Sequence, residues 1–191
     1  MNWKELWELI SENHILRRYL VMNSFDGTLS AFGLVIAMFL SKVSDPKLVL
    51  ISGIGVVFAT GISGVWSGYL SEKAERKHEL LELKRLNPGE NLESRKKEFG
   101  ELTIIMGLAN GMSTAIVGAL VISPFFFAAA HFVPVQTAFL ISFALVAVIL
   151  VILGAVMSRI SKESFWKHAF LTLLAGFMVG IIIFLFELLK F

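Results

Sequence analysis

Residues 135–157 read VQTAFLISFALVAVILVILGAVM and contain no charged side chain. A helix rises about 1.5 Å per residue, so a stretch of this length crosses the roughly 30 Å hydrocarbon core of a bilayer. Four more segments, at about residues 20–41, 47–70, 102–123 and 168–189, are similarly apolar. We therefore expect an all-α polytopic membrane protein with five transmembrane helices.

The composition also favours a membrane protein. Of the 191 residues, 56% are hydrophobic and 17% are charged, with a mean hydropathy of +0.76. Soluble domains carry about 25% charged residues. The length suits one compact unit, so we expect residues 1–191 to form a single membrane domain in contact with the lipid bilayer.

Several classes of function are disfavoured. The chain has no cysteine, and therefore no disulfide, thiolate metal site or cysteine nucleophile. The net charge is only +2, and no basic patch interleaved with aromatic residues suggests nucleic-acid binding. The sequence also lacks a phosphate-binding loop, a nucleophile elbow and a zinc motif. We expect no nucleic-acid partner and no enzymatic activity.

One long polar segment, residues 71–101, separates the second span from the third. No helix breaker lies between Tyr69 and Leu86, so the second span is expected to continue into this segment as one helix. The Asn-Pro-Gly at residues 87–89 marks a turn, after which a second helix is expected to run into the third span. The sequence thus predicts a helical hairpin that projects from the membrane surface.

The basic residues predict the orientation. Of the 17 lysines and arginines, only Lys42, Lys47 and Lys190 fall on the outer side when the N-terminus is placed inside. Because cytoplasmic loops are enriched in Lys and Arg, we expect a cytoplasmic N-terminus and a cytoplasmic hairpin. The expected location is the plasma membrane of a prokaryote.

Two shorter segments are expected at the membrane surface. Residues 1–19 are amphipathic, with tryptophans and glutamates on different helical faces, which is typical of a helix lying in the interface. Residues 125–133 are apolar but lie between two prolines, and they are expected to form a wide loop or a short interfacial helix.

Asp26 is the strongest functional signal. It lies about six residues into the first span, with apolar sequence on both sides. A charge at bilayer depth costs several kcal/mol, so such residues usually face a polar interior or a pathway. Asn23, Asp26 and Ser30 share one helical face and could line a route for a cation or a proton. The alternative is a structural aspartate that is protonated or hydrogen-bonded to a neighbouring helix.

The second and third spans carry further polar groups that could line the same route. Ser63 belongs to a stripe of hydroxyl side chains in the second span, and Asn110 is the corresponding polar residue of the third. The other hydroxyls of the second-span stripe are Thr60, Ser67 and Ser71.

Small residues recur at helical spacing in the spans. Glycines four residues apart predict close helix contacts. Residues 26–31, DGTLSA, also resemble residues 110–115, NGMSTA, which indicates either an internal repeat or a shared need for small residues. The glycine pairs are Gly64 and Gly68, Gly107 and Gly111, and Gly176 and Gly180.

The hairpin contains the densest carboxylates. Glutamates spaced three or four residues apart lie on one helical face, and carboxylates from two facing helices can bind a divalent cation. The alternative is a solvent-exposed helix that binds no metal and whose glutamates pair with nearby basic residues. A single Glu-x-x-His at residues 75–78 gives weak support to a di-iron oxidase. The candidate metal ligands are Glu72, Glu75, Glu79, Glu98 and Glu101.

The pattern resembles the vacuolar iron transporter family. Residues 21–37, VMNSFDGTLSAFGLVIA, resemble the first span of that family with its Asp-Gly. Residues 58–79, FATGISGVWSGYLSEKAERKHE, resemble its second span, which runs into a charged helix. Five spans with one large cytoplasmic segment between the second and third complete the resemblance.

The resemblance implies a homodimer that moves ferrous iron, and often manganese, out of the cytoplasm in exchange for protons. The metal would be the substrate, with no permanently bound cofactor. Asp26 would match the pore aspartate, and the hairpin glutamates would collect the metal. Gly64 and Gly68 depart from the pattern, because the family usually carries a methionine and a glutamate there. The alternative is a non-transporting membrane protein of the same fold that senses metal or binds a partner.

Overall fold

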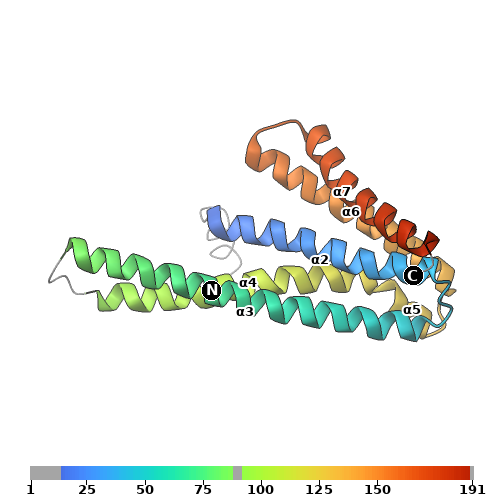
Figure 1. The fold of residues 1–191 in the computed structure, drawn as a ribbon, viewed down its shortest axis with the longest axis horizontal. Coiled ribbons are helices and arrows are strands. Elements are labelled where there is room, and N and C mark those ends of the chain that lie inside the picture. The colour runs from blue at the N-terminus through green and yellow to red at the C-terminus, as the bar shows by residue number, and fades with distance from the viewer. Residues whose placement is uncertain (1–13, 88–91, 190–191) are drawn as a thin grey trace.

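The computed structural model describes residues 14–87 and 92–189, which form helices joined by short turns (Figure 1). Five of these helices are long and apolar enough to cross a membrane, and the described residues contain no strand, so the predicted all-α membrane fold is confirmed. Most of the expected surface segment 1–19 lies outside the described residues, and residues 14–19 are the first turns of α2. The helices are α2 (His14–Leu40), α3 (Pro46–Leu86), α4 (Glu93–Ile122), α5 (Pro124–Ala129), α6 (Val135–Ser161) and α7 (Phe165–Leu188).

Helix α3 is 41 residues long, about twice what a bilayer requires. Its start is fixed by Pro46 in the first turn and by the Asp45 carboxylate, which accepts a hydrogen bond from the Lys47 amide at 2.9 Å. The helix then continues to Leu86 without interruption, as the sequence predicts. In Figure 1 it projects beyond the other spans together with the first turns of α4. We call this side of the bundle the hairpin end.

The opposite end of the bundle is closed by the short helix α5. Pro124 begins it directly after α4, and Phe125 is fully buried. Of the two forms expected for residues 125–133, the structure shows a short helix followed by a turn. Phe125 packs edge-on against Phe139 of α6, with ring centroids 4.9 Å apart.

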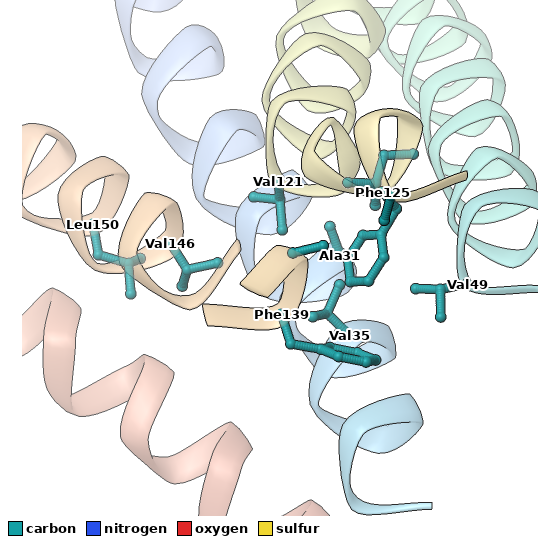
Figure 2. Packing of buried hydrophobic residues seen from close by; sticks show 11 residues of the cluster. Ala31, Val35, Val49, Val121, Phe125, Phe139, Val146 and Leu150 are labelled. Atoms are coloured by element: carbon teal, nitrogen blue, oxygen red, sulfur yellow. The ribbon is translucent and has the colours of Figure 1, made fainter. Parts of the chain in front are cut away.

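The apolar core gathers near this closed end (Figure 2). Val35 of α2, Val49 of α3 and Val121 of α4 surround Phe125 and are fully buried. Ser142 of α6 is also buried, and its hydroxyl donates to the Val121 carbonyl at 2.8 Å. The closed end is therefore held by side-chain packing.

Glycines hold α2, α3 and α4 together along the rest of their length. A Cβ added at Gly64 would lie 2.8 Å from the Gly111 Cα, and one at Gly111 would collide with the Gly61 carbonyl. Gly27 of α2 contacts the Thr114 backbone of α4 in the same way. The close helix contacts predicted from the glycine spacing are confirmed for α3 and α4. Residues 26–31 and 110–115, the two similar segments, thus pack against each other.

Candidate cation pathway

A polar groove of about 400 Å³ runs between α2 and α3. It brings together Asp26, Asn23, Ser30 and Ser63, four of the five residues expected to line a pathway. Hydroxyls of α3 continue the lining, and the floor is formed by Thr114 of α4. The α3 residues other than Ser63 are Ala59, Thr60, Gly64 and Ser67.

Asp26 has no partner in the part of the chain that the structure describes. Its carboxylate makes no hydrogen bond or ion pair with residues 14–87 or 92–189, and the residue is exposed at the surface of the bundle. Ser30 and Ser63 beside it are exposed as well. Within one chain, the hydrogen bond to a neighbouring helix that a structural aspartate would make is not found.

The neighbouring polar groups are oriented by their own helices. The Asn23 side-chain amide donates to the Tyr19 carbonyl at 2.7 Å, and the Thr60 hydroxyl donates to the Val56 carbonyl at 2.8 Å. The Thr60 hydroxyl uses its one hydrogen within the helix and the Asn23 amide uses one of its two, while the oxygen of each side chain can still act as an acceptor or a ligand. An oxygen-rich groove beside a carboxylate suits a hard cation.

Asn110 lies beneath the groove and does not line it. It is buried, and its side-chain amide donates to the Gly64 carbonyl at 2.7 Å. This bond ties α4 to α3 at the level of Ser63. Asn110 therefore holds α3 and α4 together below the polar groove.

The glycines that depart from the resemblance, Gly64 and Gly68, lie at close contacts between α3 and α4. A Cβ at Gly68 would lie 2.8 Å from the Asn110 amide nitrogen and 2.9 Å from its Cβ. At Gly64 the obstacle is the α4 backbone at Gly111. A methionine at position 64 or a glutamate at position 68 would therefore push α4 away from α3.

The five candidate metal ligands of the hairpin do not converge within one chain. Glu75, Glu98 and Glu101 are exposed, and Glu79 pairs with Arg76 at 2.9 Å. Over the described residues, no three carboxylates or imidazoles lie close enough together to hold a metal ion. Among the described residues, the Glu-x-x-His at 75–78 therefore has no third ligand beside it.

Glu72 differs from the other hairpin glutamates because it is only 5% exposed. The Tyr19 hydroxyl donates to its Oε1 at 3.1 Å, and the Arg76 guanidinium lies 3.5 Å from its Oε2. Tyr19 places the first turns of α2 beside α3 at Glu72, and among the described residues α2 extends no further along the hairpin (Figure 1). Sequence reasoning missed Tyr19, although it lies four residues before Asn23 and seven before Asp26 on the same helical face.

A five-span helical bundle with a carboxylate in a polar groove is typical of integral membrane transporters. The VIT family model matches residues 17–106 and 89–186, and the chain belongs to this family of membrane metal ion transporters. It is also similar to an uncharacterized protein of Methanocaldococcus jannaschii, with 30% identity over 174 residues. That match covers 89% of this chain and 87% of the relative.

Proposed function

We propose that this protein exports a divalent metal, ferrous iron or manganese, from the cytoplasm in exchange for protons. The observation that supports this proposal best is the Asp26 carboxylate, which lies in the polar groove without a partner. A carboxylate binds either a metal ion or a proton. If the two compete for Asp26 as the protein alternates between its inward and outward states, metal and protons move in opposite directions.

A second copy of the chain would cover the groove. Asp26 is exposed on the face of α2 and α3 that turns away from the core, and a carboxylate facing hydrocarbon is costly. In a two-fold symmetric dimer the same surface meets itself, so two grooves and two Asp26 side chains would enclose one pathway. The proposed homodimer thus removes the energetic penalty that a single chain would incur.

The hairpin would collect the metal on the cytoplasmic side. Its exposed glutamates lie on α3 and α4 beyond the end of the groove, where the basic residues of the chain also predict the cytoplasm. Since no three ligands group among the described residues of one chain, we propose that glutamates of both copies contribute. The ligands proposed for this role are Glu72, Glu75, Glu79, Glu98 and Glu101.

The groove chemistry bears on the choice of metal. The polar side chains that line the groove carry only hydroxyl, carboxylate and amide groups. Gly64 stands where the vacuolar iron transporters usually carry a methionine. Without a thioether, the groove has no donor that favours soft ions. We therefore propose that manganese is accepted at least as readily as ferrous iron.

Metal flux into proteoliposomes across a pH gradient tests the proposal. Wild type should move Mn²⁺ and Fe²⁺, and Asp26→Asn should lower the initial rate by about 100-fold, since the neutral amide removes the charge that binds both metal and proton. Asp45→Asn is the matched control, because asparagine caps a helix as well as aspartate does and Asp45 lies outside the groove.

Two outcomes would contradict the proposal. Flux through Asp26→Asn at the wild-type rate would exclude Asp26 as the pore ligand. Tight metal binding by wild type with no flux of manganese, iron, cobalt or zinc would instead favour the second candidate, a non-transporting metal-sensing or interaction protein of the same fold.

A further inference from the structure

The polar groove ends at a link between Tyr19 and Glu72. Its lining reaches Asn23 on α2 and Ser67 on α3. One turn further toward the hairpin end, α2 carries Tyr19 and α3 carries Glu72, and the tyrosine hydroxyl donates to the carboxylate at 3.1 Å. This pair therefore lies between the hairpin and the groove.

The Glu72 carboxylate is buried but incompletely satisfied. Its Oε2 makes no hydrogen bond with any described residue, and its nearest charged neighbour is Arg76 at 3.5 Å. A buried carboxylate is costly unless it is paired and hydrogen-bonded. One oxygen of Glu72 therefore has capacity for a further positive partner.

Arg76 has a second carboxylate available to it. Its guanidinium lies 2.9 Å from Glu79 on the outer side of the hairpin and 5.2 Å from the centre of the Phe99 ring. If a cation bound Glu72, Arg76 would keep the Glu79 ion pair and the contact with the aromatic ring. Glu72 can thus exchange Arg76 for a metal ion without leaving the arginine unpaired.

We propose that Glu72 is a cation-binding residue at the mouth of the groove, and that Tyr19 and Arg76 occupy it when no metal is present. This inference rests on the proposed function, in which the groove carries the metal. Glu72 receives the cation from the exposed hairpin glutamates and passes it to Asp26. Tyr19 and Asp26 are seven residues apart on α2, which corresponds to about 10 Å.

Equilibrium Mn²⁺ binding to the purified protein tests this role without requiring transport. Tyr19→Phe removes one hydrogen bond to the charged carboxylate, so Glu72 becomes more available and the Kd for Mn²⁺ should fall by about tenfold. Tyr69→Phe is the matched control, because Tyr69 is the other tyrosine of the chain and contacts Trp66 and Lys73 instead.

The double variant separates this role from a structural one. Glu72→Gln should weaken Mn²⁺ binding, and adding Tyr19→Phe to it should bring no tightening, since the carboxylate is already gone. Glu163→Gln, in the turn between α6 and α7, controls for the loss of one acidic charge. If Tyr19 only supported the fold, its variant would lower the melting temperature and leave the Kd unchanged.

Three results would overturn the inference: an unchanged Kd in Tyr19→Phe, a tightening that persists in the Glu72→Gln background, or equal Kd values for Glu72→Gln and Glu163→Gln. The last comparison remains decisive if Tyr19→Phe does not fold. If the transport proposal itself is wrong, a different assay will show it: Asp26→Asn will transport metal at the wild-type rate.

Discussion

The contact between α3 and α4 and the contact of α2 with the α6–α7 pair are formed in different ways. Between α3 and α4, Gly64 and Gly111 bring the backbones into direct contact over the part of the bundle that carries the groove. Against α6 and α7, α2 makes side-chain contacts that leave an apolar cleft of about 520 Å³ beside Phe32, Phe143 and Phe177.

The difference indicates which part of the bundle can change shape. Direct backbone contacts have no flexible groups that could adjust, whereas side chains can change rotamer and refill a cleft. In Figure 1 the α6–α7 pair diverges from α2 toward the hairpin end. We therefore expect α2, α3 and α4 to move as one unit during transport and the α6–α7 pair to shift against it.

The largest effect is expected for Gly111→Ala. A methyl group there would collide with the Gly61 carbonyl and lie 2.5 Å from the Val65 amide nitrogen, so α3 and α4 must separate. The free energy of unfolding should fall by about 3 kcal/mol. Thermal unfolding in detergent measures this loss.

Gly100→Ala is the control in the same helix, because no atom lies within 4 Å of the added methyl group. It should leave stability unchanged or raise it, since alanine is the better helix former. Equal melting temperatures for Gly111→Ala and Gly100→Ala would mean that α3 and α4 are not in backbone contact.

An intermediate effect is expected for Gly176→Ala in α7. The added methyl group would lie 2.8 Å from the Leu150 Cδ1, the end of a flexible side chain. Leu150 can rotate toward the adjacent cleft, so the loss should stay within about 1 kcal/mol. A loss as large as that of Gly111→Ala would show that the contact at Gly176 is as rigid as the one at Gly111.

The smallest effect is expected in the turn between α6 and α7. A hydrogen bond from Lys167, at 2.9 Å, and its positive charge lower the pKa of Glu163 below its usual 4.5. Because the pKa is lowered in the folded state, the stabilisation is present above pH 4.5 and is lost as the pH falls through the lower folded value.

Lys167→Met should therefore return the pKa of Glu163 toward 4.5. The free energy of unfolding should then decrease slightly less as the pH falls. Glu163 is fully exposed, so solvent screening keeps the effect small. NMR titration of the Glu163 side chain checks the pKa directly. An unchanged pKa in Lys167→Met would exclude this ion pair in solution.

Much of the fold could be predicted from the sequence because hydropathy and proline are local signals. The five spans and the unbroken helix from Pro46 to Leu86 follow from hydropathy and the absence of helix breakers, whereas the short helix after Pro124 was one of two forms expected there. The groove was predictable in part, since helical spacing places Asn23, Asp26 and Ser30 on one face.

The role of each glutamate could not be predicted in the same way. Glu72 and Glu75 share a helical face in the sequence, yet one is buried against Tyr19 and the other is exposed. That distinction depends on where α2 begins along α3, which helical spacing does not report. Asn110 was predicted to line the groove, but the structure places its side chain against the Gly64 carbonyl below it.

The sequence by itself therefore determined that this chain crosses a membrane five times and carries an acidic residue within the first span, because both follow from the cost of exposing polar groups to hydrocarbon. Only the tertiary structure decided which polar residues meet. Gly64 and Gly111 set how closely α3 and α4 approach. Asp26 has no partner among the described residues, whereas Glu72 is buried against Tyr19.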